Sequence, residues 1–143
     1  MPSAKLYSPA LLGLATGLAA FPLSGDFPLT AEARSRSCGS VIVLGLALAD
    51  DGTVARIGMR VSACAIGQAS AAVLAQGIRG TSPARVRATT EGISDWLAGE
   101  DALPDWPGIE ALTAARAHPG RHGALLLPWK AASEALSSGA ASR

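Results

Sequence analysis

The sequence predicts an α+β fold, in which a small three-stranded antiparallel sheet has helices packed on one of its faces. Residues 27–48 and 53–62 are rich in β-branched and other apolar side chains and are separated by a turn. From Cys64 onward the pattern changes to alanine-rich and amphipathic stretches with helical spacing. Strands followed by a run of helices are typical of the α+β class.

Length and composition fit a single globular domain over residues 1–143. Hydrophobic residues make up 49% of the chain and charged residues 16%, so we expect a core rather than disorder. The formal net charge is +1, whereas a nucleic-acid-binding protein needs a concentrated basic face. The nearest approach to such a face is Arg79, Arg85 and Arg87, which are typical of a solvated helix edge. We therefore expect no nucleic-acid partner.

The apolar N-terminal segment predicts a helix over about residues 6–20 that packs on the domain. The apolar run from Leu6 to Leu23 contains two prolines and two glycines. It ends before the roughly 20 apolar residues that a membrane-spanning helix needs. Lys5 and the Ala19–Ala20 pair imitate a secretory signal only weakly, so a cleaved signal is the less favoured alternative. We expect no membrane partner and a cytoplasmic location.

Turn and alternation signals define the strands. Asp50–Asp51–Gly52 suits a hairpin, because aspartate and glycine tolerate the positive φ angles of tight turns. Residues 53–62 alternate strictly, and one face carries Ala55, Ile57, Met59 and Val61 while the other carries Val54, Arg56, Gly58 and Arg60. Residues 41–48 are apolar on both faces, which predicts a strand covered on one side and partly covered on the other.

Two helices are predicted after the strands. Residues 64–78 are rich in alanine, whose small side chain allows close approach to the sheet. Ser82 and Pro83 combine an N-cap serine with proline at the first helical position. The buried stripe of this second helix is predicted to be Val86, Ile93, Trp96 and Leu97.

The remainder of the chain is predicted to be a linker, a short helix, a turn and a long final helix. The linker covers residues 101–108 and the short helix residues 109–116. The final helix carries on one face Leu125, Trp129, Ala132 and Leu136. Pro128 predicts an irregular first turn in it, and the composition of residues 137–143 predicts a frayed tail.

The two cysteines, Cys38 and Cys64, are the candidate functional residues. Two cysteines are too few for a disulfide scaffold. Cys38 lies at a predicted turn, and Cys64 lies where a strand is followed by a helix. The positive end of a helix dipole favours the thiolate, which is the form that binds metal or attacks sulfur. For each cysteine the alternative is a small buried core residue.

Three short motifs occur in order along the chain. The first is Cys38–Gly39–Ser40, the second covers residues 62–71 around Cys64, and the third covers residues 116–130. They resemble the Cys-Gly-Asp, Gly-Cys-Ala-Ile-x-x-Ala-Ser-Ala and Arg-x-x-Pro-x-Arg-x-x-Cys-Ala-x-Leu-x-Trp-Lys segments of the NifU/IscU/SufU-type iron–sulfur cluster assembly scaffolds. The resemblance covers about residues 27–136 and implies a SufE/IscU-like fold.

The resemblance also implies a ligand set, and that set is incomplete. In the family, three cysteines hold a nascent iron–sulfur cluster or a zinc ion, with an aspartate or a histidine nearby. Cys38 and Cys64 match the first two cysteines, and His122 matches a histidine of the IscU branch. The third cysteine position is Gly123, and the aspartate position is Ser40.

The function that these matches imply is that of a scaffold-like protein that binds an iron–sulfur cluster or metal weakly through Cys38 and Cys64. His122 is the further metal ligand, or alternatively a surface residue at a helix start. Thiolates suit zinc and iron–sulfur clusters, and two chains could supply two thiolates each across a homodimer. The implied partners are a cysteine desulfurase and cluster-acceptor proteins.

Two other functions remain open at this point. The chain could be a metal-free sulfur acceptor of a cysteine desulfurase, or a degenerate paralogue that acts as a protein-interaction module. The sequence contains no Ser/His/Asp set, phosphate-binding loop or metalloprotease spacing, so we do not expect an enzyme. Arg116 and Arg121 match family arginines and are expected to hold the Cys64 region or a carbonyl.

Overall fold

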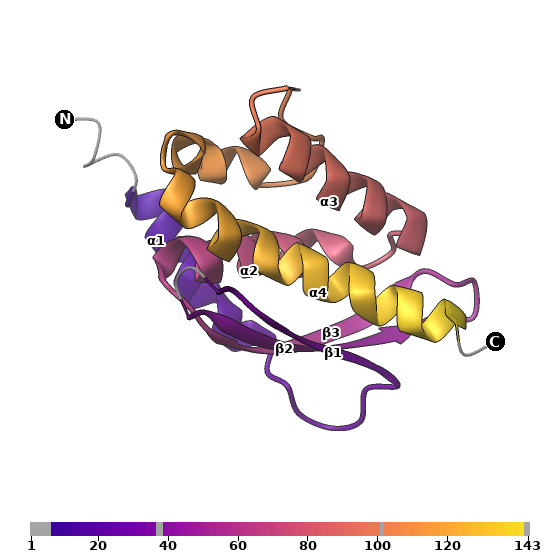
Figure 1. The fold of residues 1–143 in the computed structure, drawn as a ribbon. Helices are drawn as coiled ribbons and strands as arrows, with labels where there is room; N and C mark the ends of the chain where they lie inside the picture. Colours follow the sequence, from indigo (N-terminus) through magenta and orange to yellow (C-terminus); the bar gives the residue numbers. More distant parts are fainter. Residues whose placement is uncertain (1–6, 37–38, 101, 142–143) are drawn as a thin grey trace.

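The computed structural model describes residues 7–36, 39–100 and 102–141. Its sheet has the strand order β1-β2-β3 with antiparallel neighbours. The strands are β1 (Leu29–Arg34), β2 (Val41–Leu48) and β3 (Val54–Ser62). Figure 1 shows the long helices stacked over one face of this sheet. The predicted α+β class, with three antiparallel strands, is confirmed.

The helices form a layer on the sheet and a second layer above it (Figure 1). Their bounds are α1 (Pro9–Thr16), α2 (Ala65–Ile78), α3 (Pro83–Leu97) and α4 (His122–Ala141), with 3₁₀ segments η2 (Gly17–Ala20), η3 (Ile109–Ala117) and η4 (Pro119–Arg121). Helices α2 and α4 contact the strands, while α3 packs on α4 and α1 packs on α2. The core lies between the sheet and α2 with α4.

The N-terminal segment forms a shorter α-helix than predicted and continues as a 3₁₀ turn from Gly17. Ser8 caps α1 by accepting a hydrogen bond from the Leu11 backbone N–H at 3.2 Å. Leu11 is buried whereas Leu12 is exposed, so α1 packs on the domain through one side only. In the described part of the chain, no helix combines the length and apolar character that crossing a membrane requires.

The strict alternation predicted for β3 fails at its first residues. Ile57 and Met59 are buried as predicted, but Val54 is buried as well, although strict alternation places it with exposed Arg56. Arg56 pairs with Ala47, and Val54 pairs with the next residue of β2. One extra residue in β3 is therefore a β-bulge, which resets the alternation and turns Val54 into the core.

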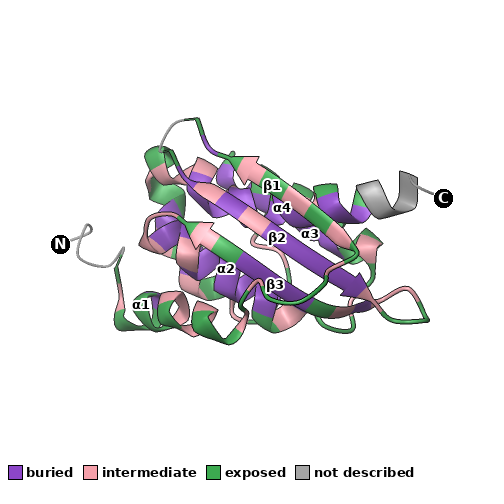
Figure 2. Cartoon of the chain, turned by 90° about the horizontal axis from the view of Figure 1, so that it is seen from below, coloured by how far each residue is buried: buried purple, intermediate pink, exposed green. Residues whose placement is uncertain are grey.

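The face of the sheet away from the helices is partly covered, as the apolar pattern of residues 41–48 predicted. Figure 2 views this face, with β2 in the middle and largely buried. Gly45 and Gly58 pair directly opposite each other, and a Cβ on either residue would come within 2.7 Å of the Phe27 ring. The two glycines therefore let the ring of Phe27 lie flat on the sheet.

Pro128 does not interrupt the final helix, contrary to the prediction of an irregular turn there. Helix α4 runs from His122 through Pro128 to Ala141, and the irregular turn is the 3₁₀ segment that precedes it. A proline in a helix removes one backbone hydrogen bond and strains the preceding turn. The Ser70 hydroxyl donates a hydrogen bond to the Leu125 carbonyl in that turn at 2.6 Å. The helix also continues beyond residue 137, where fraying was predicted.

Candidate functional site

The register of the sheet brings the first two motifs to the same end of the molecule. Val41, the first residue of β2, pairs with Arg34 on one side and with Ser62 on the other. The turn between β1 and β2, which contains Ser40, therefore lies beside the junction of β3 and α2. Cys64 is in that junction.

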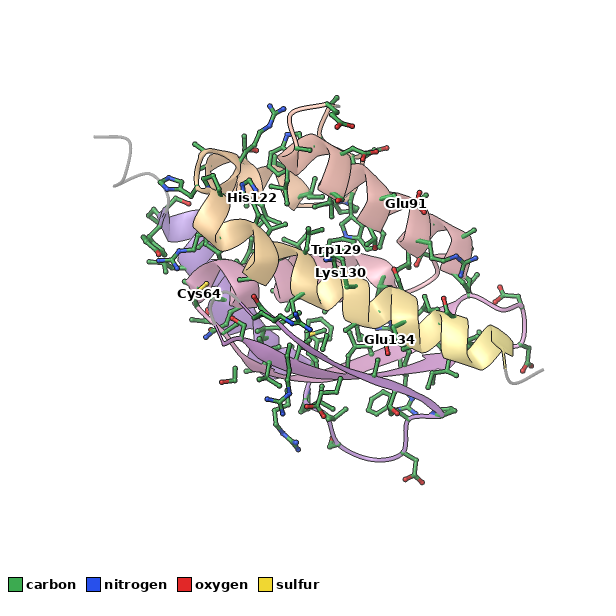
Figure 3. The ribbon with its side chains drawn as sticks, viewed as in Figure 1. Cys64, Glu91, His122, Trp129, Lys130 and Glu134 are labelled. Carbon is green, nitrogen blue, oxygen red and sulfur yellow. The ribbon has the colours of Figure 1, made fainter. Side chains whose placement is uncertain are left out.

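The third motif reaches this end through a close contact between α2 and α4. A Cβ on Gly67 would lie 3.4 Å from the Ala124 carbonyl oxygen and 3.5 Å from the Ala124 Cβ. These are ordinary van der Waals separations, so the first turns of α2 and α4 are in contact, and the atom that leaves no room for a side chain at Gly67 is the Ala63 Cβ, at 2.8 Å. His122 and Gly123 directly precede Ala124, so they enter from the same side as Cys64. Figure 3 shows Cys64 and His122 toward the same end of the molecule.

We call this region the cysteine end and define it by Ser40, Cys64, His122 and Gly123. The predicted ligand Cys38 lies outside the described residues. Within the described residues, no three or more His, Cys, Asp or Glu side chains are grouped so that they could hold a metal ion. The ligand set Cys38, Cys64 and His122 therefore stays a prediction.

Cys64 is the N-cap residue of α2, which agrees with its predicted place at a strand–helix junction. Its side chain makes no capping hydrogen bond, and its thiol is free and partly exposed. Its backbone carbonyl accepts from Gln68 N–H at 3.0 Å. The Gln68 side chain also ties down the preceding residue, because its amide donates to the Ala63 carbonyl at 2.8 Å. The backbone around Cys64 is thus held, and its side chain is partly buried against the hydrophobic core.

One of the two ring nitrogens of His122 makes a hydrogen bond to the backbone. Its Nε2 lies 2.9 Å from the backbone carbonyl oxygen of Arg116. A carbonyl oxygen only accepts, so Nε2 must carry a hydrogen, and in the neutral ring Nδ1 then keeps its lone pair. Histidines that bind metal through one nitrogen commonly donate from the other to a carbonyl. The hydrogen bond of His122 therefore fits a ligand that binds through Nδ1.

Arg116, whose carbonyl bonds His122, is itself hydrogen-bonded to helix α3. Arg116 Nε donates to the Trp96 carbonyl at 2.8 Å, and its guanidinium carbon lies 5.6 Å from the centre of the Trp96 ring. The prediction that Arg116 holds a carbonyl is confirmed. A chain of contacts thus links the end of α3, through Arg116, to His122 at the start of α4.

The turn at Ser40 has a defined backbone. Gly39 has φ +72°, a left-handed conformation in which a side chain is strained. The Gly39 N–H donates to the Ser35 carbonyl at 3.0 Å, and the Ser35 N–H donates to the Ser40 carbonyl at 2.9 Å. Ser40 is buried. The glycine of the first motif therefore shapes the turn, while the serine supplies a neutral oxygen where the resembled family has an anionic one.

Sequence reasoning missed the role of Ser70, which joins two motifs behind the cysteine end. Its hydroxyl donates to the Leu125 carbonyl and accepts from Trp129 Nε1 at 2.9 Å. The Trp129 ring meets Trp106 edge-on, with ring centres 4.9 Å apart. Trp106 Nε1 in turn donates to the Val73 carbonyl at 3.0 Å. A serine in the middle of an alanine-rich buried helix is the signal that could have revealed this network.

Comparison with known proteins identifies the fold. No protein-family model matches the sequence, and the curated proteins give no significant match. Among solved structures, the N-terminal part of a nitrogen-fixing NifU-like protein from Brucella abortus aligns with a TM-score of 0.92, at 23% identity over 100% of both chains. The chain has the NifU-like fold.

A second solved structure supports the same fold. A protein from the thermophile Fervidobacterium islandicum AW-1, assigned as an iron–sulfur cluster assembly scaffold for the SUF system, aligns with a TM-score of 0.81. The identity is 23%, and the alignment covers 92% of this chain and 96% of that one. The fold that the three motifs implied is therefore confirmed.

Proposed function

We propose that this protein is a scaffold-like component of iron–sulfur cluster assembly that binds a cluster or metal ion weakly through Cys38 and Cys64. The observation that supports the proposal most strongly is the meeting of three separate motifs at the cysteine end. Sheet register brings the first two motifs together, and the contact of Gly67 with Ala124 brings in the third. The likeness to scaffold structures in fold agrees with this role.

The side chains of the cysteine end suit a weakly held cargo. Cys64 offers a free, partly exposed thiol at a helix N-terminus, where partial positive charge favours an anionic ligand atom. His122 offers Nδ1, while Ser40 is neutral and Gly123 has no side chain. A [2Fe–2S] cluster usually takes four thiolates. Cys38 and Cys64 together supply two thiolates, so the cluster would depend on further ligands, from water or from a partner chain.

The proposal includes partners and a location. A cysteine desulfurase would supply sulfur, and acceptor proteins would remove the finished cluster, so the cargo must stay exchangeable. We place the protein in the cytoplasm and assign it no catalytic turnover of its own. A homodimer that shares one cluster would supply the missing thiolates.

The free, partly exposed thiol of Cys64 also favours a second candidate, a sulfur acceptor without metal. A Cys64 thiolate would attack the terminal sulfur of a persulfide on the desulfurase. The sulfur–sulfur bond of the donor breaks, a new one forms on Cys64, and the donor cysteine leaves as a thiolate. This reaction needs one accessible thiol and no further ligand. In the third candidate, a protein-interaction module, neither cysteine is required.

Anaerobic reconstitution with iron and sulfide tests the first candidate. We expect visible charge-transfer absorption and bound iron in the unmodified protein, and loss of both in the C38A/C64A double variant. Absence of absorption together with absence of bound iron or zinc by elemental analysis would exclude the scaffold role. Incubation with a cysteine desulfurase and cysteine, followed by mass spectrometry, then detects any extra sulfur on Cys64 or Cys38.

A further inference from the structure

The outer edge of β3 is covered by backbone at two points. At one of them the Met59 N–H donates to the Phe21 carbonyl at 2.9 Å. At the other the Val54 N–H donates to the Thr81 carbonyl at 2.9 Å, and the Gly80 N–H donates to the Val54 carbonyl at 2.8 Å. These segments shield the two ends of the strand from further pairing.

Between the two covered points, Ile57 lies at the sheet edge with its side chain in the core, and the residue as a whole is 7% exposed. The outward bond of Met59 shows that its N–H points away from β2, and Met59 pairs with Leu44. Residues two apart in an antiparallel strand point the same way, so the N–H and carbonyl of Ile57 also point away from β2. Among the described residues, no backbone hydrogen bond joins Ile57 to the segments that cover Val54 and Met59.

A groove of about 400 Å³ lies along this part of the edge. Phe21 and Phe27 contribute apolar walls, and Arg56 and Arg79 contribute positive charge. No acidic side chain lines the groove. The volume falls within the roughly 300–1,000 Å³ typical of ligand sites.

The two arginines keep their charge available. One terminal nitrogen of Arg56 donates to the Asp26 carbonyl at 2.8 Å, and its guanidinium carbon lies 4.6 Å from the centre of the Phe27 ring. These contacts orient Arg56 without neutralising it. Arg79 is exposed at the end of α2. In the described part of the chain the ion pair found is Arg34 with Glu32, so neither groove arginine has a carboxylate partner there.

We propose that this groove binds an extended acidic segment of a partner protein by strand addition at Ile57. Strand addition takes affinity from main-chain hydrogen bonds and specificity from pockets for alternate side chains. The Ile57 N–H and carbonyl supply the main-chain pairing, and the aromatic walls accept apolar side chains. Arginine pairs with carboxylates through two parallel hydrogen bonds, which selects aspartate or glutamate at the intervening positions.

The groove is separate from the cysteine end. Ile57 precedes Cys64 along β3 by a stretch of chain that spans roughly 20 Å at the usual rise of a strand. A partner held at the groove would leave Cys64 accessible. Binding there would also persist if the cysteine end carried neither cluster nor sulfur, so the two proposals can fail independently.

Selection from a displayed library of random heptapeptides tests the proposal on the full chain. We expect the selected peptides to be enriched in aspartate or glutamate at alternating positions. In a titration of ¹⁵N-labelled protein with the best synthetic peptide, the Ile57 amide should be among the largest shifts. Methylation of the peptide backbone nitrogen that faces Ile57 should weaken binding at least tenfold.

Matched arginine variants separate the groove from general electrostatics. R79Q removes a charge that makes no described contact, and we expect it to weaken peptide binding about threefold. R56Q/R79Q removes both positive charges of the groove, and we expect it to weaken peptide binding at least tenfold. R87Q, on the exposed side of α3, should bind like the unmodified protein. No acidic enrichment, unchanged binding in R56Q/R79Q, or an unmoved Ile57 amide would overturn the proposal. Equal affinity for succinate would also overturn it, since the groove would then be a small-anion site.

Discussion

Cys64 and Ser70, which both belong to the second motif, differ in what their side chains contact. Cys64 is partly exposed and its side chain makes no capping hydrogen bond, whereas Ser70 is fully buried and bonds both Leu125 and Trp129. Gly67, between them, lies against Ala63 and faces Ala124 of α4. Most of this motif therefore encodes packing, and the proposed chemistry rests on its cysteine.

This difference explains how a chain keeps the fold while its ligand set is incomplete. Gly123 and Ser40 replace the cysteine and aspartate of the resembled family at the cysteine end. Ser70 and Trp129 form the buried network that joins α2 to α4. Because packing and chemistry reside in different residues, the fold is a firmer conclusion than the activity. The predictions below test that separation, from the largest expected effect to the smallest.

Trp129→Ala should lower the free energy of unfolding by about 3–5 kcal/mol, which is typical of truncating a buried tryptophan. Trp129 is fully buried, contacts Trp106 edge-on and donates to Ser70, so the variant loses all three contributions. Urea unfolding measures the change. Lys130→Ala, at the exposed next position, should change stability by less than about 0.5 kcal/mol. Equal changes in the free energy of unfolding for the two variants would show that the buried contacts of Trp129 do not stabilise the fold.

Ser70→Ala should cost about 2 kcal/mol, because it leaves a buried carbonyl and a buried indole N–H without their partner. The exposed Ser62→Ala provides the control. In a double-mutant cycle with Trp129→Phe, the two losses should be clearly less than additive, since both remove the same hydrogen bond. Full additivity would contradict the network that joins the two motifs.

Gly39→Ala should cost about 1–2 kcal/mol, because an alanine in a left-handed conformation is strained. Gly13→Ala, inside α1 where a Cβ meets nothing within 4 Å, should be neutral or stabilising. Thermal or urea unfolding of the pair checks the result. If Gly39→Ala behaves like Gly13→Ala, the glycine of the first motif does not shape the turn at the cysteine end.

The smallest expected effect is a pKa change at Asp51, in the turn between β2 and β3, away from Cys64 and Ser70. The Thr53 hydroxyl and backbone N–H donate to the Asp51 carboxylate at 2.6 and 3.0 Å, and they lower the pKa of Asp51 from 3.8. A lowered pKa adds stability at pH values above the unfolded pKa, and that contribution is lost as pH falls through the folded pKa. Thr53→Val should raise the pKa of Asp51 toward 3.8, as measured by carboxyl NMR titration. An unchanged pKa would show that the hydroxyl is not the main cause.

The sequence predicted those parts of the fold whose signals are local. The Asp51–Gly52 turn, the Ser82 cap and the N-cap position of Cys64 each depend on a few neighbouring residues, and all three are present. The bulge in β3 was missed because it is a feature of how β3 pairs with β2, where Arg56 faces Ala47 and Val54 faces Leu48. Such pairing is a property of the folded chain and leaves no local pattern.

The candidate site was predictable in its residue types but not in its contacts. The motifs predicted Cys64 and His122 as ligands, which stays a prediction, and the hydrogen bond of His122 to the Arg116 carbonyl depends on how η3 and α4 are joined. Pro128 argued locally against a continuous helix, yet α4 runs through it and is held in the preceding turn by the Ser70 hydroxyl, which lies 55 residues away from Leu125 in sequence. A long-range contact of this kind cannot be read from the residues next to a proline.

The central claim, that the motifs form one ligand site lacking a third thiolate, is tested most directly by restoring that thiolate. Gly123→Cys should bind more iron per chain and give stronger visible absorption than the unmodified protein after anaerobic reconstitution with iron and sulfide. The gain should vanish when Cys64 is also replaced by alanine. Gly120→Cys, three residues earlier, should give no gain. An equal response of the two glycine variants, or a gain that survives Cys64→Ala, would contradict a shared site at the cysteine end.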